Sequence, residues 1–591
     1  MKILSIHLGH NCTAGLSING ELKFLKSEER FNRIKNCVGF PIETVRYIKK
    51  EFLNNDLFSL DKIIIIDETG LALNYILKGK LTHKEYSKDP WLTNKKNYFF
   101  NLILNLFNLE LLSLFVKIKK QIYFIFFNFF FSKKKSLKKI FSLFKDVEFD
   151  LNKTYFYNHH ECHALSFAYF YKNFQKKTFL IFTADGEGDN ESSSVYTFKN
   201  NIKKISSNSK DHSLGYLYMF ITEHLGLRGN EHEFKVMGMA SYGKNIHAQR
   251  LSKKLKEIFF LDSNGNIKSK IISSLLKYKI LEIFKYERFD NISAGIQKFT
   301  ENFLNEWIEF WIKKTGIKNI ILSGGVFMNI KANMLILKSK HIKSLFVVPS
   351  SSDESLPIGA LWKANNDSLI ATKPILNLYL GSSYENSVKN FIKKKYVTKK
   401  FKVTKFYNYK NLNNAASNLL KKNNIIARCS GREEWGARSL GNRSILCNPS
   451  NIENVKKINK LIKSRDFWMP FSPTILQEDK NLFLKHLKNF NLKYMTMLAD
   501  STLLAQKKLT AAVHPMDNTL RPQLLSKSDN PSYYDLIYQF KKKTGIGALL
   551  NTSFNLHGEP NVSNYEDAVN TVYKSDLKYL ILENFLLEKI K

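Results

Sequence analysis

Residues 3–20 read ILSIHLGHNCTAGLSING, an apolar strand that turns through small and polar residues and returns as a second strand before Asn19-Gly20. Asn-Gly turns match the twist of antiparallel strands, so this pattern predicts a β-hairpin. Residues 178–196 repeat the pattern: an apolar strand runs into the loop ADGEGD at 184–189 and returns. Two segments of the first half therefore share one strand–turn–strand design.

A third segment ends in a glycine turn. The apolar strand 320–322 leads into Ser323-Gly324-Gly325, and we expect a helix to begin within 326–329, a range that ends at Asn329. Backbone N–H groups at glycine turns approach phosphates closely, and a helix N-terminus favours an anion. A single glycine-rich turn is more often only a turn, but the three segments together predict a nucleotide site. In this order they resemble the phosphate-1, phosphate-2 and adenosine segments of the actin/hexokinase-like ATPase superfamily.

The length of the chain predicts two domains. Its 591 residues are too many for one ordinary hydrophobic core. The motifs stop between 364 and 376, where Pro374 precedes a new strand at 376–380, so we place the domains at 1–370 and 371–591. The second half alternates helical and extended patterns, which favours an α/β domain. These patterns are helical at 412–422, extended at 425–429 and helical at 455–462.

The composition is strongly basic, with a formal net charge of +39. Such a charge is typical of proteins that bind nucleic acid, phosphate-rich ligands or anionic membranes. The lysines, however, recur along the whole chain among Asn and Ile, which favours a compositional bias. Five cysteines do not make a disulfide framework, and the N-terminus lacks the pattern of a signal peptide. We therefore expect a cytoplasmic protein.

An aromatic-rich insertion occupies about residues 90–145. Its core, 98–131, reads YFFNLILNLFNLELLSLFVKIKKQIYFIFFNFFF and is interrupted by Asn, Glu and Lys. No window reaches the roughly 18 uninterrupted apolar residues of a spanning helix. We expect a buried helical insertion rather than an amphipathic hairpin on a membrane surface, although a peripheral membrane contact is the alternative.

The sequence HHECHA at 159–164 predicts a metal site. His159 and His163 lie four residues apart, so on a helix both imidazoles project from one face. Isolated pairs of this kind are usually structural, but Asp353 supplies a hard oxygen ligand elsewhere in the chain, and Asp185 is a weaker candidate. Imidazole and carboxylate ligands suit Fe, Mn, Zn or Mg, and the spacing does not choose among them.

The second half is unusual for its arginines. GREEWGARSLGNRS at 431–444 contains three arginines among glycines and small residues, and Arg465 and Arg521 follow. In a lysine-rich chain this choice indicates bidentate recognition of an oxyanion, against the alternative of a solvated basic surface. A small phosphorylated ligand fits better than a nucleic-acid backbone, which favours a broader basic stripe with stacking aromatics. Asn551 and Ser553, in a polar turn after an apolar strand, could complete an anion pocket.

Taken in order, these segments resemble the O-carbamoyltransferases of nodulation and antibiotic biosynthesis. The resemblance runs from Met1 to about Leu580, except in the insertion, and implies a TsaD-like, actin/hexokinase-related N-terminal domain and a YrdC-like α/β C-terminal domain. It implies an enzyme that uses ATP to move a carbamoyl group from carbamoyl phosphate, through a carbamoyl-adenylate, to a hydroxyl acceptor such as a sugar or secondary metabolite. The segments that carry it are HHECHA (159–164), LSGGVFMNIKAN (322–333), GREEWGARSLGNRSIL (431–446) and LNTSFNLHGEP (550–560).

The resemblance also implies roles for individual residues. His159, His163, Asp353 and Asp185 would bind the divalent metal, and His10 would be the general base near the acceptor. The nucleotide would contact Lys235, Ser323, Gly324, Gly325 and Asn329. Carbamoyl phosphate or the adenylate would contact Arg438, Arg443, Arg465, Arg521, Asn551 and Ser553, with Lys235 and Arg443 also taking part in catalysis.

The sequence departs from the family pattern at several positions. The first-loop His-Asp pair is His10-Asn11, Gly-Pro-Arg is Gly436-Ala437-Arg438, and the arginine before Pro-Phe is Met469. None of these changes replaces a candidate metal ligand.

Two other interpretations compete: a tRNA threonylcarbamoyl-adenosine-type enzyme, and a non-catalytic nucleotide-binding protein at a membrane surface. Against the first, the closest motifs are those of the small-molecule enzymes; against the second, the metal and arginine residues are retained.

Overall fold

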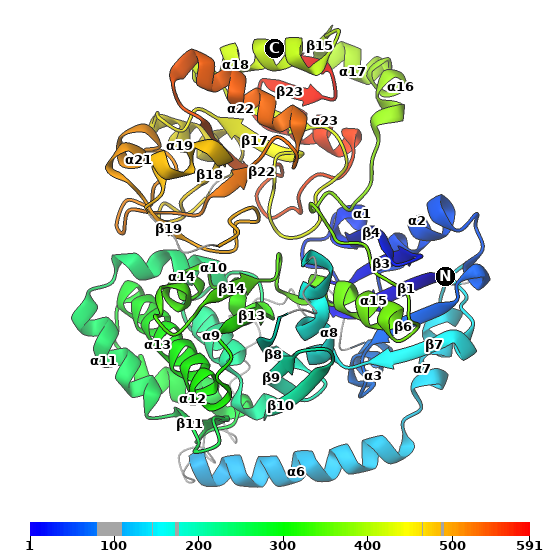
Figure 1. Ribbon diagram of the computed structural model, residues 1–591, viewed down its shortest axis with the longest axis vertical. Helices are drawn as coiled ribbons and strands as arrows, with labels where there is room; N and C mark the ends of the chain where they lie inside the picture. The colour runs from blue at the N-terminus through cyan, green and yellow to red at the C-terminus, as the bar shows by residue number, and fades with distance from the viewer. Residues whose placement is uncertain (80–108, 145, 172–176, 464, 486–489, 591) are drawn as a thin grey trace. The chain divides into compact units, whose positions relative to one another are not determined.

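The computed structural model describes residues 1–79, 109–144, 146–171, 177–463, 465–485 and 490–590. The chain forms two compact units (Figure 1). The first contains Met1–Glu21 and Cys37–Pro374, and the second contains Leu22–Asn36 and Ile375–Lys591. A short N-terminal segment, 22–36, therefore belongs to the second unit although its neighbours in sequence belong to the first.

The first sheet of the first unit is built around β1 (Lys2–His7). Strand β3 (Thr13–Ile18) pairs with β1 in antiparallel register, which confirms the hairpin predicted at 3–20. On the other side β1 pairs in parallel with β6 (Lys62–Ile66), which pairs in parallel with β7 (Thr154–Tyr157). The side chains of β1 and β6 are almost all buried, as expected of a central pair of strands.

The second sheet repeats this topology around β8 (Phe179–Gly188). Strand β9 (Glu191–Phe198) pairs with β8 in antiparallel register, which confirms the second predicted hairpin, and β10 (Ile202–Ser209) pairs with β9. On the other side β13 (Asn319–Ser323) and β14 (Ser344–Val347) continue the sheet in parallel. Both sheets thus place an antiparallel hairpin beside two parallel strands. This duplication confirms an α/β fold of the actin/hexokinase type.

Two helices pack between the sheets. Helix α15 (Leu356–Asn366) covers β1, β3 and β6, and α8 (His159–Leu165) packs on β8 and against α15. The carboxyl ends of β8 and β13 therefore lie beside α8. This arrangement brings the glycine turns and the histidine motif into one region of the unit.

A second group of helices in the first unit packs around α13 (Phe289–Thr315), whose Trp307 and Trp311 are buried. Helices α10 and α14 pack directly on α13. The helix expected within 326–329 begins as a single 3₁₀ turn, Gly325–Met328, and α14 starts at Ile330. The neighbouring helices are α9 (Leu214–His224), α10 (Glu233–Met239), α11 (Asn245–Lys256), α12 (Ser273–Ile283) and α14 (Ile330–Lys338).

The insertion forms α6 (Leu109–Phe130) and α7 (Lys133–Ser142); residues 80–108 of the predicted insertion lie outside the described residues. The prediction of helix is confirmed for 109–130, but the prediction of a buried insertion is wrong there. Among the α6 side chains that the structure describes, only one face packs, because Leu114, Phe115 and Ile118 are exposed. Among the described residues, no helix is long and apolar enough to cross a membrane.

The second unit is built on an eight-stranded mixed sheet with the order β15-β24-β23-β16-β17-β22-β18-β21. Helices α22 (Pro531–Thr544) and α23 (Tyr565–Lys574) pack on this sheet, and α18 (Tyr409–Lys421) packs on α22. The patterns predicted at 412–422, 425–429 and 455–462 match α18, β16 and α19 (Glu453–Ile458) with the π-helical turn Asn459–Lys463 that follows it. The strands are β15 (Phe401–Lys405), β16 (Ile426–Cys429), β17 (Arg443–Cys447), β18 (Ser472–Leu476), β21 (Gln523–Leu525), β22 (Ala548–Ser553), β23 (Tyr579–Leu582) and β24 (Phe585–Lys589).

Candidate metal centre and anion site

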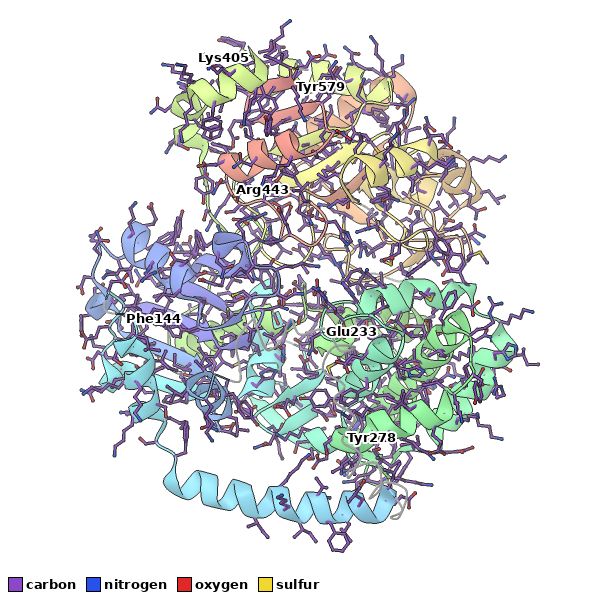
Figure 2. The ribbon with its side chains drawn as sticks, turned by 180° about the vertical axis from the view of Figure 1, so that it is seen from behind. Phe144, Glu233, Tyr278, Lys405, Arg443 and Tyr579 are labelled. Carbon is purple, nitrogen blue, oxygen red and sulfur yellow. The ribbon has the colours of Figure 1, made fainter. Side chains whose placement is uncertain are left out.

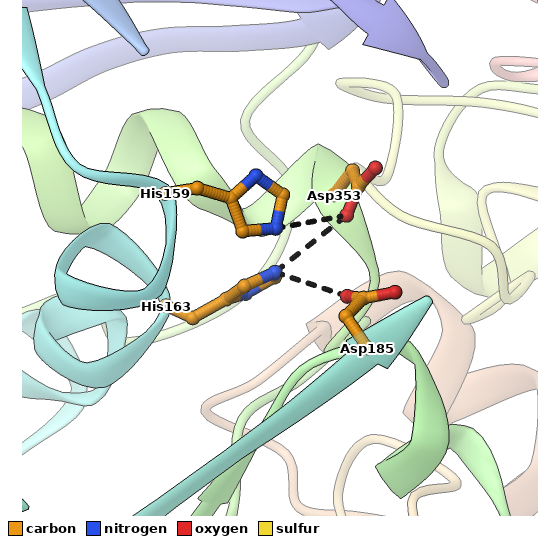
Figure 3. A group of neighbouring side chains, drawn as sticks. All are labelled: His159, His163, Asp185 and Asp353. Atoms are coloured by element: carbon orange, nitrogen blue, oxygen red, sulfur yellow. Dashed lines mark ion pairs between the residues drawn. The ribbon is translucent and has the colours of Figure 1, made fainter. Parts of the chain in front are cut away.

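Four side chains of the first unit converge on one point (Figure 3). His159, His163, Asp185 and Asp353 each offer one ligand atom, and these atoms all lie within 4.8 Å of one another. Nε2 of His163 lies 3.2 Å from Asp185 and 3.6 Å from Oδ1 of Asp353, while Nε2 of His159 lies 3.7 Å from the same Oδ1. The structure thus brings together all four residues predicted to bind metal.

Local structure explains this convergence. The Asn158 side chain accepts a hydrogen bond from the Glu161 N–H and begins α8, so His159 and His163 occupy successive turns of one face. Asp185 lies on β8 where the strand emerges from the core. Asp353 begins the 3₁₀ turn Asp353–Ser355 that leads into α15.

The donor atoms fit a divalent cation. Nε2 of His159, Nε2 of His163 and Oδ1 of Asp353 are buried and make no hydrogen bond within the described chain. Buried polar atoms without a partner are rare, and three that face one point require an explanation. Two imidazole nitrogens and two carboxylate oxygens form a mixed set that suits Fe, Mn or Zn.

Neighbouring groups hold the ligands in place. The N–H of Gly325 donates to Oδ2 of Asp185 at 2.8 Å, and the N–H of Gly186 is 2.8 Å from Oδ1. The hydroxyl oxygens of Ser323 and Ser355 each lie 3.4 Å from Nδ1 of His163. Such partners fix the orientation of an imidazole and the tautomer that presents Nε2 as a ligand.

The pKa values of the two histidines are shifted in opposite directions. Burial lowers the pKa of His159 well below its usual value, so this imidazole is neutral and its lone pair is available. Burial also lowers the pKa of His163, but the adjacent Asp185 and Asp353 outweigh it and raise this pKa to about 9. A cation between these carboxylates would replace the positive charge that His163 otherwise carries.

Two glycines allow the turns to approach the ligands. A Cβ on Gly188 would lie 2.2 Å from the ring of His159. Gly324 has a φ of +100°, and a Cβ there would lie 2.2 Å from the carbonyl oxygen of Ala184. The glycine turn after β13 thus packs directly on the backbone of β8 at Ala184, as close approach of two backbones requires.

The structure adds His7 to this centre. Its Nε2 lies 3.6 Å from Oδ2 of Asp353, the oxygen that does not face the histidines, and 3.0 Å from the carbonyl oxygen of His10. Sequence reasoning selected His10 and missed His7, whose position at the end of a buried strand was the available signal. His10 itself lies on β2 (Gly9–His10), opposite Val38.

The predicted nucleotide residues lie in two places. Ser323, Gly324 and Gly325 form the turn against Asp185. Asn329 caps α14 and exchanges two hydrogen bonds with Gln297 of α13, at 2.9 and 3.0 Å. Lys235 lies on α10, which packs against α13.

The second unit contains a cluster of cations, which we call the cation cluster: Arg438, Lys463, Arg465 and Arg521. Burial, Arg438 and Arg465 lower the pKa of Arg521 well below its usual value. Burial and Arg438 lower the pKa of Arg465 to about 10. Burial and Arg465 lower the pKa of Lys463 well below its usual value. Like charges held together in this way favour an anion among them.

Polar groups of the predicted pocket contact this cluster. Nζ of Lys463 donates to Oδ1 of Asn555 at 2.7 Å and to the hydroxyl of Ser553 at 3.1 Å. Arg521 donates to the hydroxyl of Ser472 at 2.8 Å. Asn551 is buried and donates to the carbonyl of Ser439, next to Arg438. Sequence reasoning did not select Lys463, two residues before Arg465, or Asn555, although Asn555 lies inside the quoted segment 550–560.

Arg443 is placed differently from the other predicted arginines. It begins β17 inside the second unit (Figure 2) and is fully buried. Its guanidinium donates to the carbonyl oxygens of Ser563 at 2.9 Å and Gly431 at 3.0 Å. Burial lowers its pKa, but Glu433, Glu434 and other acidic groups outweigh this and raise it. Arg443 therefore holds the loop that leads to Arg438.

The N-terminal segment 22–36 holds the same loop. Nζ of Lys26 lies 2.9 Å from Glu433, and both side chains are almost fully buried. Arg30 lies 3.3 Å from Glu433 and donates to the carbonyl of Gly436 at 2.9 Å. Burial raises the pKa of Glu433, but Lys26 and Arg30 lower it more, so this carboxylate is ionised. The loop 431–438 is therefore anchored by residues from the start of the chain.

Known proteins resemble this chain along almost its whole length. The family described as "Carbamoyltransferase N-terminus" matches residues 2–362, and "Carbamoyltransferase C-terminus" matches residues 417–589. An uncharacterized protein of Methanocaldococcus jannaschii is 32% identical, with 95% of each chain covered. Nodulation protein NolO of Bradyrhizobium diazoefficiens is 30% identical over 73% of this chain and 79% of its own. The 3'-hydroxymethylcephem-O-carbamoyltransferase of Amycolatopsis lactamdurans is 27% identical over 42% of this chain and 45% of its own.

Proposed function

The chain belongs to the carbamoyltransferase family, and on this premise we propose that it is an ATP-dependent O-carbamoyltransferase acting through a carbamoyl-adenylate. The observation that carries the proposal is that both the N-terminal and the C-terminal family regions are present, the first with four converging candidate metal ligands and the second with a cation cluster. The acceptor is a hydroxyl compound, for which a sugar or secondary metabolite is our candidate.

The second unit would prepare the carbamoyl group. Water converts carbamoyl phosphate to carbamate and phosphate, and a carbamate oxygen then attacks the α-phosphorus of ATP. Pyrophosphate leaves, and carbamoyl-adenylate is formed. Arg438, Arg465 and Arg521 would neutralise the phosphate charges, because guanidinium groups bind phosphate oxygens in pairs.

The first unit would transfer the carbamoyl group. The acceptor oxygen attacks the carbamoyl carbon, AMP leaves, and the hydroxyl proton goes to a base, for which His10 is the candidate. A metal ion held by His159, His163, Asp185 and Asp353 would supply Lewis-acid stabilisation of the charge that develops on the carbamoyl oxygen. His7 would keep Asp353 oriented.

The proposal is tested by pyrophosphate release from purified protein given ATP, carbamoyl phosphate and a divalent metal. We expect release that depends on carbamoyl phosphate and falls at least about tenfold in Arg521→Met, because one of the converging guanidinium groups is removed. The control is Arg288→Met, whose side chain is 73% exposed in the first unit. Folded protein that binds ATP and releases no pyrophosphate with any metal would refute the proposal.

A further inference from the structure

Helix α6 carries a second, outward-facing apolar stripe. Leu114, Phe115, Ile118 and Ile122 are between 47% and 60% exposed. Their spacing of one, four and eight residues places them on one face of the helix. An apolar helix face of this kind is normally buried against another surface.

The opposite face of α6 attaches the helix to the first unit. Leu109, Leu112 and Val116 pack against a cluster formed by Ile271, Ile272 and Leu275. Lys120 of the same face forms an ion pair with Asp211 at 2.8 Å. The helix is therefore held by one side, with its second apolar side directed outward.

Apart from Glu110 at the start of α6, the charged side chains around this stripe are lysines. Helical geometry places Lys117 and Lys119 on either side of the stripe. Residues 111–145 contain nine lysines and no Asp or Glu. In α7 the exposed face consists of Lys134, Lys135, Lys138 and Lys139, opposite buried Leu137, Ile140 and Phe141.

We propose that α6 and α7 dock the protein on an anionic lipid surface, with α6 lying in the plane of the interface. The apolar stripe would enter the boundary between headgroups and acyl chains, and the lysines would lie at the level of anionic headgroups, their stems covering apolar surface. An outward apolar stripe flanked by cations is the pattern of helices that bind membranes without spanning them. A water-soluble protein partner would have to supply an apolar surface with a matching acidic rim. An anionic bilayer supplies both an apolar interior for the stripe and negative headgroups for the lysines.

The test is cosedimentation of the full-length protein with vesicles at low ionic strength. One set contains phosphatidylcholine alone, and the other an equimolar mixture with phosphatidylglycerol. We expect binding to the anionic vesicles only, weakened by salt and by about fivefold for each lysine removed. Binding of equal strength to both vesicles, or none to either, would overturn the proposal.

Two sets of variants separate the contributions. The stripe variant replaces all four apolar residues by Ser and is expected to reduce partitioning at least about a hundredfold; the lysine variant replaces the four α7 lysines by Gln. The matched controls should bind like wild type, because they lie elsewhere in the first unit. They are Ile246→Ser, Leu281→Ser, Tyr286→Ser and Leu369→Ser together, and Lys253→Gln, Lys256→Gln, Lys313→Gln and Lys314→Gln together.

Unchanged metal affinity would show that each variant still folds, because the metal centre lies in the same unit. If the stripe variant bound vesicles as tightly as wild type, lipid docking through α6 would be excluded. Lipid docking would also be excluded if wild type were a dimer that this variant dissociates, because the stripe would then be an interface between two copies of the chain.

Discussion

The metal centre tolerates no side-chain atom at Gly188. We predict that Gly188→Ala lowers metal affinity at least about tenfold, because the new Cβ would lie 2.2 Å from the ring of His159 and must displace it. Isothermal titration of metal-free protein measures the effect.

The matched control lies two residues away in the same strand, β8. A Cβ on Gly186 would have its nearest neighbour, the ring of Tyr216, at 3.6 Å, an ordinary contact distance. Gly186→Ala should therefore keep the affinity of wild type. Equal losses in both variants would indicate a general disturbance of the strand instead of a displaced His159.

His7 should position Asp353 without binding the metal itself. We predict that His7→Ala lowers metal affinity about tenfold, the scale found for partners of ligating groups, because Oδ2 of Asp353 and the carbonyl of His10 lose their neighbour. His7→Gln keeps a donor and should recover most of the affinity. The control is His247→Ala, remote in sequence on α11. If His7→Ala bound metal as wild type does, Asp353 would be held by the fold alone.

At this scale the sequence predicted which four side chains converge in the candidate metal centre, and it did not select the residues that orient them. His159 and His163 are related by helical spacing, which is visible in the sequence, and Asp353 and Asp185 were selected as oxygen ligands from other parts of the chain. His7 gave no such signal, because an alternating strand pattern fits a histidine in the core equally well. The arginines were predicted as one group, but the side chain of Arg443 meets carbonyl oxygens and acids, which only the tertiary structure determines.

The segment 22–36 stabilises the second unit through a buried ion pair. We predict that Lys26→Met lowers the free energy of unfolding by about 3–5 kcal/mol, because Glu433 loses its closest cation while remaining buried. Denaturant unfolding followed by fluorescence measures this. The exposed Lys456, which pairs with Glu453 on the surface, is the control, and Lys456→Met should change stability by less than about 1 kcal/mol.

A double variant tests whether the loss of stability comes from the unpaired charge on Glu433. In Lys26→Met/Glu433→Gln the unpaired charge is removed, so the loss should be smaller than the sum of the two single losses. Strictly additive losses would mean that the two side chains act independently, and the account of the loop as anchored by this pair would fail.

Most elements were predictable because local patterns determine them. The hairpins at 3–20 and 178–196 follow from strand alternation and turn residues, and α18 follows from its apolar periodicity. The insertion was predicted wrongly as buried: apolar content indicates helix, but it does not say which faces of α6 find a partner. The assignment of 22–36 to the second unit depends on long-range contacts with Glu433 and the loop at 559–567, which no local pattern encodes.

The whole molecule combines two designs. The first unit repeats one sheet topology, and its candidate metal ligands lie where β8, α8 and the turn before α15 meet. The second unit uses one mixed sheet whose loops carry the cation cluster. Under the proposed function, forming the adenylate and transferring the carbamoyl group depend on different residues. The two half-reactions should therefore be separable by substitution.

This separation is testable with one variant in each unit. We predict that His163→Asn keeps the first-turnover burst of carbamoyl-phosphate-dependent pyrophosphate release within about threefold of wild type, because the cation cluster is untouched, but loses at least about a hundredfold in transfer to an acceptor, because a candidate metal ligand is gone. Arg521→Met should lose both activities, since transfer requires the adenylate. Pyrophosphate and AMP are measured in parallel: AMP release should lag behind pyrophosphate only in His163→Asn. If His163→Asn abolished pyrophosphate release as fully as Arg521→Met, the metal centre would serve activation as well as transfer, and the assignment of one half-reaction to each unit would be wrong.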